Sequence, residues 1–216
     1  MEFTRMWRLL LRTVVPIGVH RVARDLRQLP ATSRPEYLRW WLASRMGGAA
    51  SMPHVTAVRT VVFVCYGNIM RSPMAAALLA RRLEQTGLAQ TIRVLSAGLH
   101  MRPGRYPPPL ALEAAAAFGV SLAGHQSLTL TTKVVESADV LFVMDFLNAA
   151  ELSARWPEAR SKVRLLGPLG ANGHTQIVDP YGTDLATTIA CYRQIAEATE
   201  VLALRLGYRP RPPTAK

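Results

Sequence analysis

One stretch decides the fold of this chain: Val61-Val62-Phe63-Val64-Cys65-Tyr66-Gly67-Asn68-Ile69-Met70-Arg71-Ser72-Pro73. Its first part is an unbroken apolar run rich in β-branched residues, as expected for a strand buried on both faces. Its last part opens an Ala/Leu-rich segment, which predicts a helix over Pro73–Thr86 that stops at Gly87. The stretch therefore predicts a strand, a short loop and a helix, with Cys65 opening the loop and Arg71 closing it.

The segments that follow alternate between the same two kinds of element. Further strands are expected at 92–95, 140–144 and 163–166, and further helices at 110–118 and 184–206. Such alternation is typical of βαβ units and predicts an α/β protein, a three-layer α/β/α fold with a four-stranded parallel sheet. Ligands of such sheets bind beyond the carboxyl ends of the strands, where Cys65 is expected.

The loop after the first strand has the composition of a phosphate site. A helix N-terminus stabilises a thiolate, and the N–H groups of a tight loop form a nest for an anion. Gly67 and Asn68 tolerate the left-handed backbone that such a loop needs. The guanidinium of Arg71 matches two phosphate oxygens. Cys65 is the expected nucleophile, and the phosphate-binding residues are Tyr66, Gly67, Asn68, Ile69, Met70, Arg71 and Ser72.

A second loop with chemical character lies between the fourth expected strand and the last helix. It reads Asp179-Pro180-Tyr181-Gly182, and its proline holds Asp179 in an extended conformation. This loop is also expected at the carboxyl edge of the sheet. Cleavage of a phosphate ester requires a proton for the leaving oxygen, which a carboxylic acid supplies. Asp179 is therefore the expected general acid, although an isolated Asp-Pro pair is more often a simple turn.

Together these residues resemble the low-molecular-weight protein tyrosine phosphatase family in its bacterial form. The resemblance covers roughly residues 58–207 and rests on five stretches in matching order. They are the loop at 64–73, Ser96-Ala97-Gly98 after the second strand, Gly124-His125, Val143-Met144-Asp145 at the end of the third strand, and Asp179-Pro180-Tyr181-Gly182.

The resemblance implies a reaction, the hydrolysis of phosphotyrosine in proteins through a cysteinyl-phosphate. It makes Cys65 the nucleophile, Arg71 the phosphate clamp and Asp179 the general acid, with no cofactor and no metal. The implied partner is a tyrosine-phosphorylated protein, such as a bacterial tyrosine kinase that controls exopolysaccharide export. The expected location is the cytoplasm, with membrane association as a further possibility for the N-terminal extension.

The resemblance also implies supporting residues. Ser72 is expected to assist the thiolate by a hydrogen bond to its sulfur. Asn68 is expected to hold the strained shape of the loop, with Ser96 and His125 as its partners. Tyr181 is expected at the rim of the site, where its ring would stack on an aromatic substrate.

Two departures from the family pattern change the expectations. Met70 stands where the family usually has a second cysteine, so a disulfide that protects Cys65 cannot form within the loop, and oxidation of Cys65 is expected to advance more readily to irreversible states. Segment 99–105 replaces a glycine-rich aromatic segment with Leu-His-Met-Arg-Pro-Gly-Arg. The arginines Arg102 and Arg105 would favour acidic substrates or form solvated surface.

The composition agrees with this interpretation. The chain has 216 residues and a formal net charge of +12, which favours acidic or phosphorylated partners. It has two cysteines, Cys65 and Cys191, so no disulfide framework is implied and a reducing compartment is favoured. Cys191 falls in the last expected helix, where a free cysteine is usually a small core residue.

Three regions are predicted: a basic, partly helical extension at 1–54, a phosphatase domain at 55–208, and a flexible proline-rich tail at 209–216. The extension has nine arginines against three acids, and 47–53 is a linker by composition. It is expected either to pack on the domain or to contact a membrane surface or a partner protein. No nucleic-acid motif accompanies its arginines, so nucleic-acid binding is not expected. No transmembrane helix is expected.

Other functions on the same scaffold remain as alternatives. An arsenate reductase needs two further cysteines for its disulfide relay, and Cys191 alone does not supply them. Phosphoarginine phosphatases resemble this loop but have threonine at the position of Ile69, so phosphotyrosine is favoured. A non-catalytic phosphate-binding or scaffold module, recruited by the basic extension, is disfavoured because Cys65, Arg71 and Asp179 are all intact.

Overall fold

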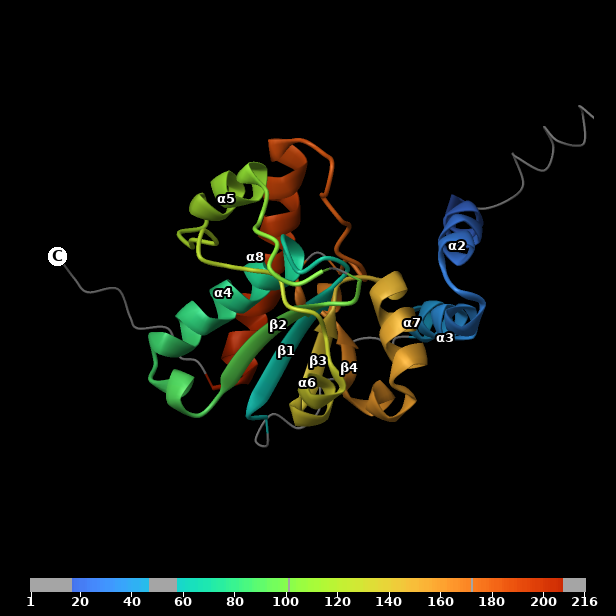
Figure 1. Cartoon of the computed structure of the whole chain (residues 1–216), viewed down its shortest axis with the longest axis horizontal. Coiled ribbons are helices and arrows are strands. Elements are labelled where there is room, and N and C mark those ends of the chain that lie inside the picture. The colour runs from blue at the N-terminus through green and yellow to red at the C-terminus, as the bar shows by residue number, and fades with distance from the viewer. Residues whose placement is uncertain (1–16, 47–57, 101, 172, 208–216) are drawn as a thin grey trace, which may run out of the picture.

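The computed structural model describes residues 17–46, 58–100, 102–171 and 173–207. Four parallel strands form one sheet in the order β2-β1-β3-β4 (Figure 1). They are β1 (Thr60–Cys65), β2 (Arg93–Gly98), β3 (Val140–Val143) and β4 (Val163–Leu165). The predicted four-stranded parallel sheet is confirmed.

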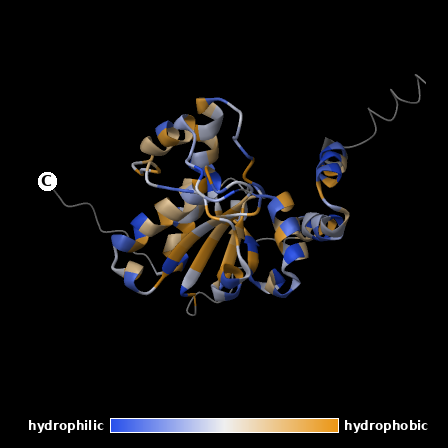
Figure 2. Cartoon of the chain, viewed as in Figure 1, coloured by the Kyte–Doolittle hydropathy of each residue, from blue (hydrophilic) through white to orange (hydrophobic). Residues whose placement is uncertain are grey.

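Helices cover both faces of the sheet because the side chains of β1 alternate between them. Val61 and Phe63 pack in a core with α4 (Arg71–Glu84), α5 (Pro109–Ala116) and α8 (Leu185–Arg205). Val62 and Val64 pack in a second core with α6 (Thr132–Ser137) and α7 (Phe146–Arg155). The central strands β1 and β3 are buried along almost their whole length, and Figure 2 shows the sheet mostly in the colour of hydrophobic residues. This arrangement is the predicted three-layer α/β/α fold.

The element boundaries differ from the prediction in a few places. Ser96, Ala97 and Gly98 lie inside β2 and not after it, because the pairing with β1 continues as far as Cys65 opposite Gly98. Helices α6 and α7 were not predicted. Both begin at a residue whose side chain caps the helix, Thr131 for α6 and Asp145 for α7. Short 3-10 turns complete the chain: η1 (Ala31–Ser33), η4 (Leu88–Gln90), η5 (Pro157–Lys162) and η6 (Gly167–Leu169).

Among the described residues, the helices α2 (Ile17–Gln28) and α3 (Arg34–Arg45) precede the sheet, and α3 lies on the outer side of α7 (Figure 1). Tyr37 of α3 is buried, with its ring edge-on to Phe146 at a centroid distance of 5.9 Å. Trp40 Nε1 donates a hydrogen bond of 3.3 Å to Ser153 Oγ of α7. This part of the extension therefore packs on the phosphatase-like unit.

Some predictions lie outside the described residues: the segment 1–16, the linker at 47–53 and the tail at 209–216. Within the part of the chain that is described, no helix is both long enough and apolar enough to cross a bilayer.

Candidate active site

The loop between β1 and α4 is shaped by Asn68. It has a φ of 51°, the one positive φ of a non-glycine residue in the described ranges. Its Nδ2 donates to Ser72 Oγ and to Ser96 Oγ, both at 2.9 Å, and its Oδ1 accepts from Leu128 N at 2.8 Å. A left-handed backbone costs about 1–2 kcal/mol for an L-residue, so these three bonds fix a conformation that the loop alone would not favour.

His125 holds the main chain of the same residue. Its Nε2 lies 2.7 Å from the carbonyl oxygen of Asn68. A carbonyl oxygen only accepts, so Nε2 carries a hydrogen in this contact. Both expected partners, Ser96 and His125, therefore reach Asn68 from segments far away in the sequence.

Gly98 permits the close approach of the loop to β2. A Cβ atom at Gly98 would stand 3.1 Å from Asn68 Cβ, the Gly67 carbonyl carbon and the Tyr66 carbonyl oxygen. Two of these three neighbours are backbone atoms, which cannot rotate away. A side chain at Gly98 would push the loop off the strand end.

Cys65 is buried at the base of the loop. Its Sγ accepts a hydrogen bond from the backbone N–H of Asn68 at 3.2 Å and lies 3.0 Å from Ser72 Oγ. Ser72 Oγ receives a hydrogen from Asn68 Nδ2, and its own single hydrogen points to Sγ or to Ala97 O, at 3.4 Å. Ser72 and the Asn68 amide are thus placed to stabilise negative charge on the sulfur.

Arg71 is almost fully buried beneath the loop. Its Nη1 donates to Asp145 Oδ2 at 2.6 Å and to Ile177 O at 3.0 Å, and its Nη2 forms an ion pair with Asp179. Burial by itself lowers the pKa of Arg71, but Asp145, Asp179 and Cys65 together outweigh burial and raise it. The guanidinium is therefore permanently charged and fixed in orientation.

Asp145 is a site residue that the sequence analysis did not identify. Its Oδ1 accepts from Asn148 N at 2.7 Å and caps α7, while its Oδ2 holds Arg71. The signal in the sequence was its place directly after a buried strand, at the same sheet edge as Cys65. Strand ends of this kind are where side chains meet a ligand in parallel sheets.

Asp179 lies on the loop before α8, with its side chain 43% exposed. Its Oδ1 accepts from the N–H of Tyr181 at 3.2 Å, and its Oδ2 faces Arg71. The structure thus brings Cys65, Arg71 and Asp179 into one pocket, with an empty volume of about 480 Å³ including its open mouth.

The pocket is lined by loop residues and by a rim. Tyr66, Tyr181 and Arg105 line it together with Ile69 and Met70. Tyr66 and Tyr181 are 49% and 61% exposed, so an apolar ring has two aromatic faces to contact at the mouth. The altered segment at 99–105 therefore contributes Arg105 to the pocket.

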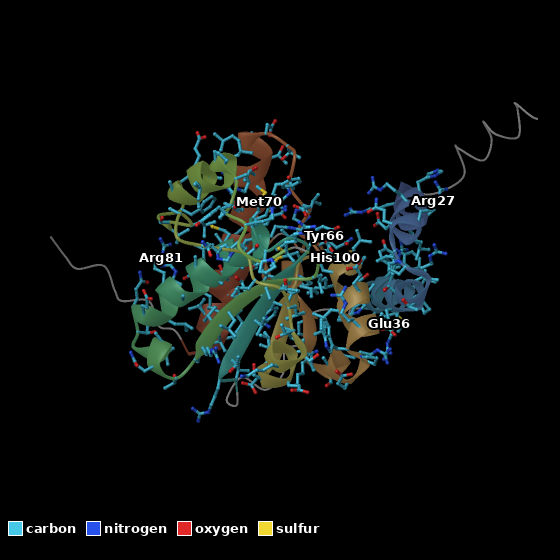
Figure 3. The ribbon with its side chains drawn as sticks, viewed as in Figure 1. Arg27, Glu36, Tyr66, Met70, Arg81 and His100 are labelled. Atoms are coloured by element: carbon cyan, nitrogen blue, oxygen red, sulfur yellow. The ribbon has the colours of Figure 1, made fainter. Side chains whose placement is uncertain are left out.

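The Tyr66 ring packs against the ring of His100, and Figure 3 shows that the two residues are neighbours. Their rings are stacked with centroids 4.7 Å apart and an interplanar angle of 21°. His100 Nε2 in turn is in hydrogen-bonding contact with the carboxyl group of Glu151 of α7. His100 and Glu151 were also missed from the sequence, because their contact joins a loop to a helix that was not predicted.

Outside the pocket, Cys191 is buried in the core around α4 and α8. Burial raises the pKa of its thiol to about 12. This agrees with its predicted place as a core residue. Within the described ranges, no group of three His, Cys, Asp or Glu side chains is arranged to hold a metal ion.

Comparison with known families decides the classification. A sequence model described as low molecular weight phosphotyrosine protein phosphatase matches residues 60–209. The chain belongs to this family. It is therefore an enzyme of the phosphoric monoester hydrolase class, as the resemblance predicted.

Several relatives show how the chain compares within the family. A probable low molecular weight protein-tyrosine-phosphatase, EpsP from Ralstonia nicotianae, is 35% identical over 59% of this chain and 82% of the relative. A protein-arginine-phosphatase from Bacillus subtilis is 33% identical over 68% and 93%. The tyrosine phosphatase Wzb from Escherichia coli K30, solved with sulphate, has a TM-score of 0.63 at 28% identity and covers 69% of this chain and 99% of its own. The family thus includes relatives named for tyrosine and for arginine substrates.

Proposed function

We propose that this phosphatase hydrolyses phosphotyrosine in proteins through a cysteinyl-phosphate on Cys65. The observation that carries the proposal is that Cys65, Arg71 and Asp179 line one pocket at the carboxyl edge of the sheet. A nucleophile, a cation and a carboxyl group are the three functions that phosphate transfer to a thiolate requires.

In the first step, the Cys65 thiolate attacks phosphorus while Asp179 donates a proton to the leaving tyrosine oxygen. The P–O bond breaks as the S–P bond forms. The loop N–H groups and Arg71 stabilise the charge on the equatorial oxygens. Asp145 and Ile177 O hold one end of the guanidinium, and substrate phosphate competes with Asp179 for Nη2.

In the second step, water attacks phosphorus and the S–P bond breaks. Asp179, now a carboxylate, accepts a proton from that water. Ser72 stabilises the departing thiolate through its contact of 3.0 Å with Sγ. Inorganic phosphate then leaves through the mouth of the pocket.

Phosphoarginine is the alternative substrate, because a protein-arginine-phosphatase is among the relatives. Two features support tyrosine. Ile69 lines the pocket, where a branched apolar side chain contacts an aryl ring better than a charged guanidine. Tyr66 and Tyr181 present aromatic faces at the mouth, which suit a tyrosine ring.

We propose a cytoplasmic location and, as partner, a tyrosine-phosphorylated protein such as a bacterial tyrosine kinase. The similar proteins EpsP and Wzb are named protein-tyrosine-phosphatases, which supports a tyrosine-phosphorylated protein as the partner. The two cysteines are both free and buried, as suits a reducing compartment.

The test is hydrolysis of a small aryl phosphate in the presence of a chelator. Cys65→Ser is expected to abolish turnover, and Asp179→Asn to reduce kcat by about 10²- to 10⁴-fold, the range for loss of a general acid. Turnover retained in Cys65→Ser contradicts the mechanism. A parallel comparison of phosphotyrosine and phosphoarginine peptides tests the substrate, and faster hydrolysis of phosphoarginine contradicts the proposed specificity.

A further inference from the structure

Helix α3 presents an apolar stripe to solvent on the side away from α7. The stripe consists of Pro35, Leu38 and Leu42 of α3 and of Met46, the residue directly after the helix. All four are exposed, the last three by 40%, 53% and 83%. Their spacings of three or four residues place them on one face of the helix. The opposite face carries Tyr37, which is buried against α7.

Arginines border this stripe on both sides. At 3.6 residues per turn, Arg34 and Arg45 fall along one edge and Arg39 along the other. All three are exposed. The guanidinium of Arg45 lies over the Trp41 ring, 4.3 Å from its centroid, and Arg34 Nε donates to the carbonyl oxygen of Leu29 at 3.3 Å. Arginine side chains can cover apolar surface in this way while the charge stays accessible to water.

The acids of this region are outnumbered by its arginines, and Asp25 pairs with Arg21 and Arg24 of α2, at 3.9 Å and 3.4 Å. Residues 17–46 contain two acids, Asp25 and Glu36. Asp25 is 5% exposed and accepts a hydrogen bond of 2.8 Å from Tyr37 Oη, and Glu36 pairs with Arg160 of η5 at 2.6 Å. Helix α2 adds the exposed Arg21, Arg24 and Arg27, so the helix pair carries an excess of positive charge even with Arg21 and Arg24 facing Asp25.

We propose that the outer face of α3 is a docking surface for an anionic lipid bilayer. An apolar stripe between rows of arginine is the pattern of a helix that lies in the membrane interface, where leucines enter the acyl boundary and arginines contact anionic headgroups. The charge complementarity selects a lipid surface over an apolar protein partner. The contacts of α3 with α7 fix the stripe on the body of the enzyme, so docking attaches the phosphatase to the membrane surface.

The docking face and the catalytic pocket belong to different parts of the molecule. The pocket lies at the carboxyl end of β1, and α3 lies outside α7 (Figure 1). None of the stripe residues lines the pocket. The enzyme is therefore able to act on a phosphorylated segment near the membrane while docked, and docking does not depend on which phosphate ester it hydrolyses.

The test is sedimentation of the full chain with vesicles of phosphatidylcholine alone or with phosphatidylglycerol added. We expect binding to the anionic vesicles only. Raising NaCl from about 0.1 M to about 1 M, which shortens the Debye length from about 10 Å to about 3 Å, should weaken it. The double variant Leu38→Ser/Leu42→Ser should lower the partition coefficient at least about tenfold, from the apolar area lost. Arg39→Gln and Arg45→Gln should each lower it about fivefold.

Matched control variants distinguish binding through this surface from nonspecific binding to vesicles. Leu204→Ser changes a leucine of α8 that is also 40% exposed, and Arg93→Gln removes an exposed arginine at the start of β2. Neither control should alter binding, and hydrolysis of a small aryl phosphate reports that every variant is folded.

Three results overturn the proposal. They are wild-type protein that does not bind anionic vesicles, binding that is unchanged in Leu38→Ser/Leu42→Ser, and a concentration-dependent dimer that is lost in that variant while vesicle binding is not.

Discussion

Arg71 is the residue on which the charge balance of the pocket depends. It is buried with its cation facing two carboxylates, and breaking a buried ion pair by removing one partner is strongly destabilising. Asp179 sits on the exposed side of this cluster and exchanges protons in the proposed reaction. Asp145 sits on the inner side and keeps the guanidinium oriented.

Asp145→Asn tests that orientation. Asparagine remains a good helix N-cap, so α7 should keep its start, while the charge opposite Arg71 is lost. We expect kcat/KM for an aryl phosphate to fall by at least about tenfold, or about 1.4 kcal/mol of transition-state stabilisation. Asp184→Asn is the matched control, since Asp184 caps α8 through Thr187 N at 2.8 Å and does not touch Arg71. An unchanged kcat/KM in Asp145→Asn would show that Asp145 serves α7 alone.

Met70 sets the response of Cys65 to oxidation. No cysteine stands beside Cys65 in the loop, so its sulfenic acid has no neighbouring thiol to form a disulfide. We expect peroxide to cause a loss of activity that thiol reverses only partly in the wild type. In the Met70→Cys variant, we expect thiol to restore the activity. Activity assays after graded peroxide and thiol treatment measure both. If thiol fully restores the activity of the wild type over a wide range of peroxide doses, this prediction is wrong.

At the scale of elements, the β1–loop–α4 unit could be predicted because its signals are local. A buried strand, a left-handed residue and a helix start follow one another within a few residues. The contacts around it could not be predicted in the same way. Arg71 and Asp145 are 74 positions apart, and Trp40 meets Ser153 across 113 positions. The first pair forms because the sheet brings β1 and β3 side by side, and the second forms because α3 packs on α7. A single sequence does not reveal either arrangement.

Helix α7 is one of the two helices that the sequence did not predict, and its start shows the reason. Its start at Asp145 has a side-chain cap, but the segment follows an apolar strand without a glycine or proline to separate them. Asp145 alone separates the strand from the helix. Since a polar residue after a strand is equally typical of a loop, the sequence did not indicate a helix start there. The residues that α7 contributes, Glu151 among them, were therefore missed with it.

The stacking of His100 on Tyr66 can be tested by its effect on substrate binding. His100→Ala should leave the Tyr66 ring without its support and raise KM for an aryl phosphate about three- to tenfold, with kcat within about twofold, because ring binding is lost before the chemical step. His100→Phe should restore KM in part by keeping a stacking ring. His174→Ala, an exposed histidine away from the pocket, is the control. If kcat instead falls about three- to tenfold and KM does not change, His100 contributes to the folded structure and not to substrate binding at the rim.

At the scale of the whole molecule, we assign different tasks to the carboxyl edge of the sheet and to the helices over one of its faces. The pocket is built at the carboxyl edge, where β1, β3 and the loop before α8 meet. The helix pair α2–α3 is attached to α7 on the other side from α4 and α8. A net charge of +12 favours anionic partners for both, a phosphate at the pocket and an anionic surface at α3.

The central claim is that Cys65 carries the phosphoryl group during turnover. Acid quenching during hydrolysis of an aryl phosphate, followed by digestion and mass spectrometry, measures where phosphate is attached. The account predicts phosphate on the peptide that contains Cys65, absent when Cys65 is replaced by alanine, which has no atom to accept it, and turnover is lost in that variant as well. Phosphate found on another residue, or turnover that continues in Cys65→Ser, would contradict it.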